Sequence, residues 1–163
     1  VDIYNYTVDG VGLATIADSL GAIEQRVVEE KRLDWHELAE LLRSDYADRE
    51  ADRLMLKNIP RYGSGNSYAD GWADRVSALF TELVKESPTP KHKFNVIPGL
   101  FSHGVIHNLG KRLGATPNGR HAHTEISHSA DPDPGLCSGT GSRRCGKARS
   151  PNVRLDGSSR VPG

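Results

Sequence analysis

A stretch rich in glycine and proline constrains the fold of this chain more than any other feature. It reads LGATPNGRHAHTEISHSADPDPG and runs from Leu113 to Gly135. Proline removes a backbone donor and glycine is costly to order, so neither a regular helix nor an inner strand can pass through it. The stretch holds three histidines, yet its ends have ordinary turn chemistry. The sequence therefore predicts either a metal-binding loop or a fixed irregular loop that belongs to a larger structure.

Helical spacing dominates the chain before this loop. Apolar residues recur every three or four positions over about 13–31, which predicts a long helix with one apolar face. Asp34 and Glu37 form a capping-box pattern that starts a second helix. Two more helices are predicted, over about 48–57 and from a cap at Asn66 or Ser67 to about Lys85.

The segment KFNVIPGLF, residues 93–101, is the best strand candidate because it is short and apolar. Pro98 cannot donate to a ladder, so a bulge or an edge position is predicted there. A self-contained domain normally pairs its strands. One convincing strand among helices is instead typical of a slice through an α/β barrel. The predicted fold class is α/β, mostly helices with one or two strands.

The composition changes abruptly after Leu136. Residues 136–163 contain five Gly, five Ser and five Arg, and a single acidic residue, Asp156. Such a segment cannot bury enough apolar surface to offset its ordering entropy. It is predicted to be a disordered, low-complexity basic tail, or the product of out-of-frame translation of GC-rich coding sequence. The domain prediction is accordingly one unit over residues 1–135 and a tail over 136–163.

The sequence also bears on location and partners. It has no apolar run long enough for a membrane span and no signal-peptide pattern. Its two cysteines, Cys137 and Cys145, lack a zinc-type spacing. Because there are only two cysteines and no secretion signal, a cytoplasmic protein is predicted. The tail lacks interleaved aromatic residues and a continuous basic run, so no nucleic-acid partner is expected. Because Val1 opens directly into patterned sequence, we expect a piece of a longer protein.

His121, His123 and Glu125 are the first candidates for chemistry. They stand two residues apart, which would place all three on one face of a strand, and two histidines with a carboxylate can hold Zn or Fe(II). The neighbouring Gly119 and Pro132 argue against a strand. A polar loop with solvated histidines is therefore the stronger prediction for this segment.

Two other positions invite a functional interpretation. Gly10 and Gly12, just before the first helix, are compatible with a phosphate-binding loop, but no GxGxxG or GKS/T pattern completes it. Glycines that permit a tight entry into the helix are the simpler interpretation. His103 follows the predicted strand, where a barrel residue is often functional. Its alternative role is that of a supporting, hydrogen-bonded residue.

Three segments, in the right order, resemble the pyruvate formate-lyase-like glycyl radical enzymes. GVGLATIADSLGAIEQRV resembles the family's G-x-x-x-ADSL-x-A-I helix, and IPRYGSGNSYADGWADRVSALFTELV resembles its P-x-[FY]-G segment. GATPNGRHAHTEISHSADPDPG is similar to the family's GxTP[DN]GR loop, so the resemblance covers about residues 4–135. It implies that the chain is a fragment of a ten-stranded α/β barrel, with this loop as a structural element and not a metal site. The structural motif residues are Asp18, Ser19, Gly114, Pro117, Asn118, Gly119 and Arg120, while His121 stands where a second Arg or Lys is usual.

The resemblance also implies a chemistry for the parent enzyme. A glycine stores a radical on its backbone carbon, and a cysteine in the barrel relays it as a thiyl that attacks the substrate. An activating enzyme that uses S-adenosylmethionine and an iron–sulfur cluster installs the radical. The parent is expected to be a cytoplasmic homodimer of anaerobic metabolism, either a formate C-acetyltransferase or a related radical dehydratase or lyase. Its substrate is expected to be a small polar metabolite, and this chain is expected to bind no cofactor itself.

The resemblance gives neither radical residue a position in this chain. The family's relay cysteine precedes the ADSL helix, so Cys137 and Cys145 do not inherit its role. The final SSRVPG mimics the radical loop as far as Gly163 but lacks the aromatic residue that follows in the family, so we interpret the match as chance. The chain alone is expected to be inactive. In the parent, the residues at the end of the predicted strand are expected to face substrate, namely Phe101, Ser102 and His103.

Two other hypotheses remain open at this point. The chain is a non-catalytic truncated product or a helical interaction module with a basic tail, or it is a small metal-binding protein that uses His121, His123 and Glu125. Metal content separates the second of these from the rest, and hydrogen exchange separates a barrel section from an independent module.

Overall fold

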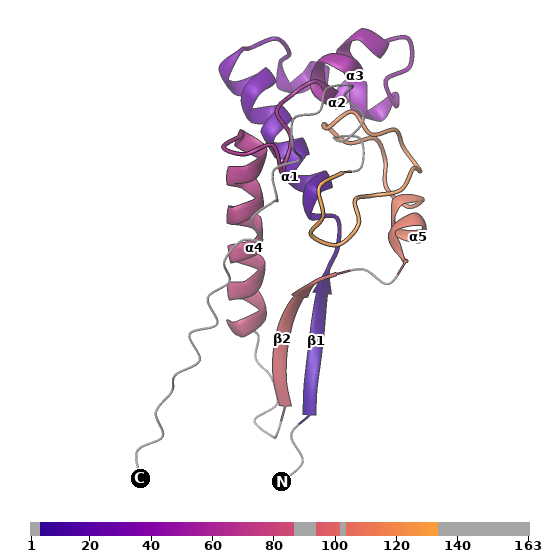
Figure 1. Cartoon of the computed structure of the whole chain (residues 1–163). Helices are drawn as coiled ribbons and strands as arrows, with labels where there is room; N and C mark the ends of the chain where they lie inside the picture. Colours follow the sequence, from indigo (N-terminus) through magenta and orange to yellow (C-terminus); the bar gives the residue numbers. More distant parts are fainter. Residues whose placement is uncertain (1–3, 87–93, 102–103, 134–163) are drawn as a thin grey trace, which may run out of the picture.

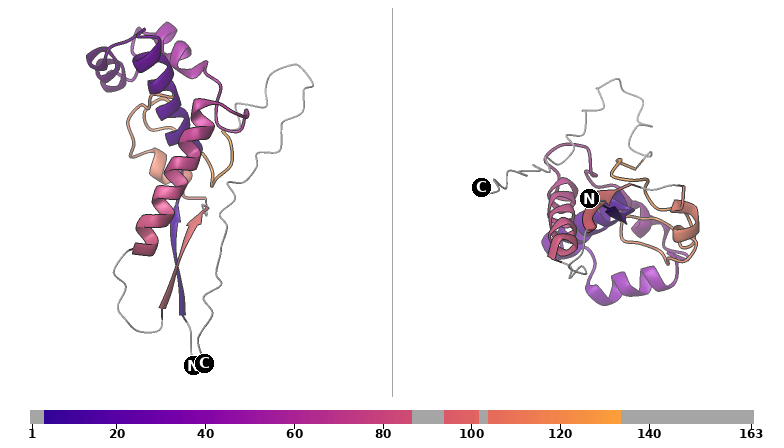
Figure 2. Two further views of the ribbon diagram at one scale, coloured as in Figure 1. Left: turned by 90° about the vertical axis from the view of Figure 1, so that its left-hand side faces the viewer. Right: turned by 90° about the horizontal axis from the view of Figure 1, so that it is seen from below.

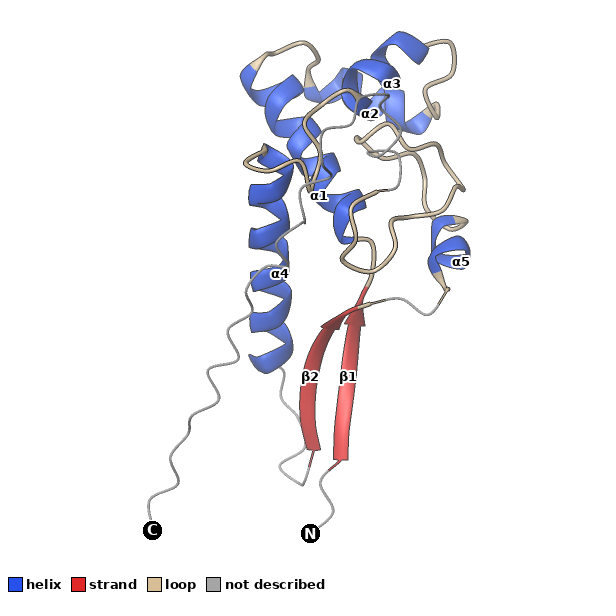
Figure 3. Cartoon of the chain, in the orientation of Figure 1, coloured by secondary structure: helices blue, strands red, loops and turns tan. Residues whose placement is uncertain are grey.

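The computed structural model describes residues 4–86, 94–101 and 104–133 of the chain. The elements follow one another along the chain with two strands at one end of the molecule and most helices at the other (Figures 1 and 3). Residues 134–163 lie outside the described part, and so does the predicted basic tail. The elements are β1 (Tyr4–Gly10), α1 (Leu13–Ala22), the π-helix η1 (Ile23–Glu29), α2 (Trp35–Arg43), α3 (Glu50–Lys57), α4 (Tyr68–Glu86), β2 (Phe94–Leu100) and α5 (Ile106–Gly110).

The two described strands, β1 and β2, form a parallel pair. Their register runs without a break from Tyr4 opposite Phe94 to Gly10 opposite Leu100. The strands twist about each other, and α4 runs alongside them (Figure 2). Parallel strands need a long crossover, which α1 to α4 supply here.

The strand prediction over 93–101 is confirmed by β2, but β1 was not anticipated from the sequence. Pro98 lies opposite Val8 within the continuous register, so the predicted bulge does not occur. Each of the two described strands has one neighbour, so Pro98 is at an edge position of the described sheet. Proline is tolerated at such a position because it has no N–H to donate to a neighbouring strand.

The long first helix is confirmed in extent, but its second half is a π-helix over Ile23–Glu29. Gly12 starts α1 in the left-handed region, at a φ of 82°, which favours glycine. At Gly21 the helix approaches α4 so closely that an added Cβ would lie 3.0 Å from the Ala69 backbone nitrogen. Small residues on both helices therefore bring α1 and α4 into contact.

Two apolar clusters hold the described residues together. One lies between α1, α4 and the loop that precedes α4 and contains Leu13, Ala14, Ala17, Tyr62, Ala69 and Ala73. The other joins the end of α1 and η1 to α2, α3 and their connections, with Leu38, Leu41 and Leu56 at its centre. The capping box that starts α2 is confirmed, because Glu37 N donates to Asp34 Oδ1 at 2.7 Å and Asp34 N donates to Glu37 Oε2 at 2.8 Å.

The fourth helix is confirmed over Tyr68–Glu86, with Ser67 at its start. Its apolar residues do not all face the core, since Leu79 and Leu83 are 55% and 56% exposed. Ala69, Ala73, Ser77 and Val84 provide the buried side instead. None of the helices in the described ranges is long and apolar enough to cross a membrane.

Candidate functional site

The two-stranded sheet has one polar face. Gly10 faces α4, because a Cβ placed there would lie 3.4 Å from the Phe80 ring. Side chains alternate along a strand, so Asn5, Thr7 and Asp9 of β1 lie on the opposite face. The parallel register puts Asn95 of β2 beside Asn5, and Asn95 Nδ2 donates to Asn5 Oδ1 at 3.2 Å. Ile97 lies on the same face, opposite Thr7. We call this face, after Asn5, Thr7, Asp9 and Asn95, the polar sheet face.

Sequence reasoning missed the polar sheet face, although a signal for it was present. In YNYTVD, residues 4–9, aromatic or aliphatic residues alternate with Asn, Thr and Asp. That period of two is typical of a strand with one apolar and one polar face. The glycines of DGVGLA were interpreted instead, as a tight entry into the first helix in preference to a phosphate-binding loop.

The structure gives the glycines of DGVGLA a structural explanation. Gly10 ends β1 against Leu100 and Phe80, where a Cβ would meet the Leu100 side chain at 3.0 Å. Gly12 makes the left-handed turn into α1, and its neighbour in space is Ile126. The segment therefore joins a strand to a helix by a tight turn, and the phosphate-binding interpretation has no further support.

Phe101 follows β2 at the end of the sheet where β1 enters α1 (Figure 1). Its side chain is 37% exposed. An added Cβ at Gly99 would lie 2.6 Å from the Phe101 ring and 3.0 Å from Asp9 Oδ1, so Gly99 leaves the space that these two groups occupy. Ser102 and His103, the other two candidates for substrate contact, lie outside the described residues.

Asp18 is the most deeply placed charge among the described residues, with 0% of its surface exposed. Arg61 lies against it: Nε donates to Asp18 Oδ2 at 2.8 Å, and Nη2 is 2.7 Å from the same oxygen. The backbone N–H of Tyr62 donates to Asp18 Oδ1 at 2.7 Å. Burial raises the pKa of the Asp18 carboxyl, and the Arg61 guanidinium acts against that rise. The ADSL helix is thus joined to the RYG segment by a buried ion pair.

The same region ties the end of the described chain to α1. Arg61 Nη2 also donates to Asp133 Oδ2 at 3.1 Å. Thr15 N donates to Ser127 Oγ at 2.9 Å, and Ser127 N donates to Thr15 Oγ1 at 2.8 Å. Ser19, the other motif residue on this helix, turns its hydroxyl back to Thr15 O at 2.6 Å.

Asp70 organises the loop that leads into α4. Its carboxylate accepts from Gly63 N at 2.7 Å, from Ser67 N at 3.0 Å and from Ser67 Oγ at 2.8 Å. Partial burial by itself raises the pKa of Asp70, but the backbone donors of Ser67 and Gly63 hold the pKa below its ordinary value. The Asp70 carboxylate therefore holds both ends of the GSGNS loop, residues 63–67.

The GATPNGR segment is a closed turn built around Arg120. Its guanidinium donates to Thr124 O at 2.8 Å and to Thr116 Oγ1 at 3.1 Å, and it also contacts the carbonyl of Gly114. Asn118 Oδ1 accepts from Thr116 Oγ1 at 2.7 Å and from Arg120 N at 3.3 Å. The segment is irregular but held by many hydrogen bonds, which is how a loop persists without regular secondary structure.

Helix α3 and the preceding turn hold this segment from outside. Gly119 has a φ of 80°, and an added Cβ would lie 2.8 Å from Lys57 Cβ. Arg53 Nη1 donates to Gly119 O at 2.9 Å, and Tyr46 Oη donates to Thr116 O at 2.6 Å. Burial raises the pKa of Tyr46 to about 12, so its hydroxyl remains a donor. At Gly114 a Cβ would meet open space, so this residue contributes through its carbonyl.

The three residues of the metal hypothesis do not converge. His121 Nδ1 lies 3.1 Å from Asp45 Oδ1, and His123 Nδ1 lies 2.8 Å from the carbonyl oxygen of Lys111. Glu125 Oε2 is 2.9 Å from His107 Nδ1. Within the described ranges no three His, Cys, Asp or Glu residues are grouped to hold a metal ion. The structure therefore gives the metal hypothesis no support, because each of the three side chains is directed to a different neighbour.

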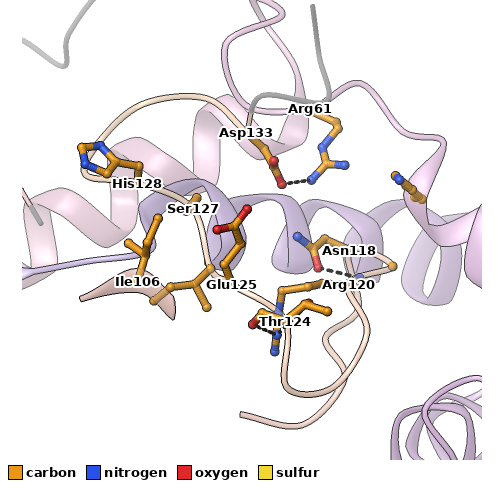
Figure 4. Close-up of a pocket in the computed structure, with 12 residues that line it drawn as sticks. Arg61, Ile106, Asn118, Arg120, Thr124, Glu125, Ser127, His128 and Asp133 are labelled. Atoms are coloured by element: carbon orange, nitrogen blue, oxygen red, sulfur yellow. Dashed lines mark hydrogen bonds and ion pairs between the residues drawn. The ribbon is translucent and has the colours of Figure 1, made fainter. Parts of the chain in front are cut away.

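A pocket of about 280 Å³ lies between the GATPNGR turn and the Arg61 ion pairs (Figure 4). Lys57 and Arg61 contribute cations to its wall, and Glu125 and Asp133 contribute carboxylates. Ile106 and Ile126 supply apolar surface. The pocket is made by residues from α3, α5 and the loops between 118 and 133.

Comparison with known proteins decides the family. The family described as "Pyruvate formate lyase-like" matches residues 2–105. The chain belongs to this family of glycyl radical enzymes. Over 128 residues it is 35% identical to isethionate sulfite-lyase of Oleidesulfovibrio alaskensis, a match that covers 74% of this chain and 15% of that protein. It is 29% identical over 133 residues to trans-4-hydroxy-L-proline dehydratase of Clostridioides difficile, covering 78% of this chain and 16% of the dehydratase.

The fold of this glycyl radical enzyme chain also has solved counterparts. The glycerol-bound form of the B12-independent glycerol dehydratase from Clostridium butyricum aligns with a TM-score of 0.73 at 28% identity. That alignment covers 78% of this chain and 16% of the dehydratase. The chain thus spans about one sixth of the length of the relatives that it matches.

Proposed function

We propose that this chain forms part of the barrel wall of a radical lyase or dehydratase that breaks a carbon–heteroatom bond in a small polar metabolite. The observation that carries the proposal is the parallel β1–β2 pair, with one polar face, inside a segment that matches the pyruvate formate lyase-like family. The relatives reported above are a sulfite-lyase and dehydratases. They favour this reaction class over a formate C-acetyltransferase.

The two strands would be neighbours in a ten-stranded α/β barrel. Both outer edges of the pair are without a partner among the described residues, as expected if further strands continue the sheet on each side. The face that carries Gly10 is directed toward α4, and the polar sheet face would then point into the barrel. An interior lined by Asn5, Thr7 and Asp9 offers hydrogen bonds to a hydroxylated or charged substrate.

The end of β2 would complete this surface. Phe101, Ser102 and His103 follow the strand at its carboxyl end, where α/β barrels place substrate-contacting residues. The Phe101 ring beside Asp9 would provide an apolar wall that excludes water from a radical intermediate. Asp9 would orient a substrate hydroxyl or cation by a charge-assisted hydrogen bond.

The radical itself would come from elsewhere in the parent enzyme. A protein glycyl radical supplies hydrogen-atom abstraction, and an activating enzyme with S-adenosylmethionine and an iron–sulfur cluster installs it. Cys137 and Cys145 lie outside the described residues and take no part in the proposal. The residues described here would bind and orient substrate and shield it from water, in a cytoplasmic homodimer.

A chimeric enzyme tests the proposal. Residues 4–133 of this chain replace the aligned segment of the Oleidesulfovibrio isethionate sulfite-lyase, which is then activated by its own activating enzyme. We expect a glycyl radical signal by electron paramagnetic resonance and sulfite release from isethionate. Asp9→Asn in the chimera should lower turnover and leave the radical signal, whereas Asp74→Asn on the outer helix should change neither. A chimera that carries the radical and turns over equally well with Asp9→Asn would refute the role given to the polar sheet face, and a folded chimera without any radical would refute the barrel placement.

A further inference from the structure

Asn118, a buried residue that lines the pocket beside the GATPNGR turn, has a side-chain N–H donor that no described residue accepts. Asn118 is 3% exposed, and its Oδ1 accepts from Arg120 N and from Thr116 Oγ1, which fixes which end of the amide is oxygen. The Nδ2 group is left without an acceptor in the described structure. No fully buried side-chain nitrogen or oxygen of the described residues lacks a partner, so Asn118 Nδ2 must reach the open space of the pocket. Figure 4 shows this nitrogen on the side of the amide that faces Arg61 and Asp133.

Two cations add donors to the same wall. Arg61 uses Nε and Nη2 on Asp18 and Asp133, and its Nη1 has no acceptor among the described residues. Lys57 lines the pocket at its exposed rim and forms none of the ion pairs found in the described structure. Asn118, Arg61 and Lys57 therefore present unused N–H groups to one space. A carboxylate, with two acceptor oxygens and a negative charge, matches this set.

Two carboxylates also line the pocket. Asp133 lies beside Arg61, with Oδ2 3.1 Å from Arg61 Nη2. Figure 4 shows the Glu125 carboxylate directed toward the interior, and its Oε2 also lies 2.9 Å from His107 Nδ1. A ligand that carried negative charge alone would be repelled by these two groups. A ligand with an ammonium group a few atoms from its carboxylate would be attracted at both ends. The volume of about 280 Å³ is sufficient for a molecule of that kind.

We propose that this pocket binds a small amino acid zwitterion, with its carboxylate at Asn118 and Arg61 and its ammonium group at Glu125. The site is separate from the polar sheet face and does not rest on the function proposed above. Residues from three parts of the chain, α3, the RYG segment and the loop 118–133, close around the ligand. Binding would therefore hold these parts together.

Asparagine at position 118 supplies the N–H donor that a carboxylate ligand needs. The GxTP[DN]GR pattern accepts either Asp or Asn at this place in the turn. An aspartate would keep the oxygen that accepts from Thr116 and Arg120, but it would replace the Nδ2 donor with a second acceptor. Asn118→Asp is therefore a variant that preserves the turn and removes the donor from the pocket.

Calorimetric titration of the full 163-residue chain, with folding checked by circular dichroism, tests the proposal. L-alanine is the probe, and acetate and ethylamine carry its two charges separately. We expect saturable binding of L-alanine and weaker binding of each single-charge probe. Asn118→Asp should weaken L-alanine binding by about tenfold or more, because a donor to a charged group is lost and a like charge is added.

Two controls distinguish this site from general charge effects. Asn108→Asp makes the same chemical change on α5, at a residue that does not line the pocket, and should leave L-alanine binding unchanged. Lys57→Gln removes the rim cation and should weaken binding of both L-alanine and acetate. No saturable binding of L-alanine by the folded chain, equal binding by the Asn118→Asp variant, or acetate binding as tightly as L-alanine would each overturn the proposal. The Asn118 side-chain amide resonances, followed by NMR, should shift with L-alanine and provide a second readout.

Discussion

Arg61 forms an ion pair with Asp18 at 2.7 Å, across 43 residues of sequence and at a point where the carboxylate has no contact with solvent. Tyr62 N donates to the second oxygen of the same carboxylate. The Arg61 guanidinium therefore neutralises Asp18 of α1 and joins the RYG segment, residues 61–63, to that helix. Through Asp133 it also binds the end of the described chain. This relationship is the main polar link between the motifs.

Removal of the arginine should be severely destabilising. Arg61→Ala leaves Asp18 buried without a counter-charge, for which the expected loss is about 3–5 kcal/mol of unfolding free energy. Arg43→Ala, at an exposed pair with Glu40, is the matched control and should cost no more than about 0.5 kcal/mol. Urea unfolding followed by circular dichroism measures both. A loss at Arg61 no larger than the loss at Arg43 would show that the buried pair does not stabilise the fold.

The loop before α4 should make stability depend on pH through Asp70. The pKa of Asp70 is lowered in the folded chain, so its contribution is fully present above the unfolded value of about 3.8 and is lost as the pH falls through the folded pKa. The difference in unfolding free energy between the native chain and Asp70→Asn should be largest near neutral pH and should shrink toward pH 3. Asp74→Asn, whose carboxylate accepts none of these loop bonds, removes the same negative charge from α4 and is the matched control. A constant difference for Asp70→Asn would argue against the loop hydrogen bonds.

Two helical glycines should respond in opposite directions to the same substitution. An added Cβ at Gly110 would lie 2.1 Å from Thr124 O, so Gly110→Ala must displace the loop and lower the midpoint of thermal unfolding. At Gly71 in α4 a Cβ meets nothing within 4 Å, so Gly71→Ala should stabilise the chain by about 0.5–1 kcal/mol through helix propensity. Differential scanning calorimetry of the two variants decides the matter. Stabilisation by Gly110→Ala would mean that α5 and the 124–125 backbone are not in contact.

The histidines after Arg120 should contribute nothing to metal affinity. His121, His123 and Glu125 are each directed to a different partner. Zinc titration of the chain and of a His121→Ala, His123→Ala double variant should therefore give equal affinities. A tenfold loss of affinity in the double variant would restore the metal hypothesis.

Local patterns predicted the helices, and non-local contacts decided what was missed. The Asp34–Glu37 capping box and the start of α4 at Ser67 depend on residues within three positions of each other, and both are readable from sequence. Strand β1 forms by pairing with β2, about 90 residues further along the chain. The alternation in residues 4–9 is too short to predict the strand by itself. The π-helical turn of η1 had no sequence signal that we recognised.

In the candidate site, too, the contacts that sequence reasoning missed are non-local. The resemblance drew attention to Asp18 and Arg120. Arg120 was expected to bind loop carbonyls or a carboxylate, and it does bind loop carbonyls, but the partner of Asp18 was not predicted. Arg61 pairs with Asp18 only because the loop before α4 crosses α1, and the Asn118 donor is free only because its oxygen is used by the turn. On a strand His121 and His123 would share a face, but a polar loop was the stronger prediction. The φ of 62° at His123 agrees with it, because this left-handed residue turns the chain between His121 and Glu125. Spacing predicts shared direction only where the backbone is regular.

Hydrogen–deuterium exchange, read by mass spectrometry on peptides from β1 and β2, tests the barrel placement most directly. An isolated two-stranded sheet is marginally stable in water, whereas a strand with neighbours on both edges is strongly protected. We predict that the β1 and β2 amides exchange rapidly in the 163-residue chain and slowly in the chimera with isethionate sulfite-lyase, while α1 and α4 are protected more than the strands in the chain alone. Equal protection of both strands in the isolated chain and in the chimera would contradict the account, because the sheet would then need no further strands.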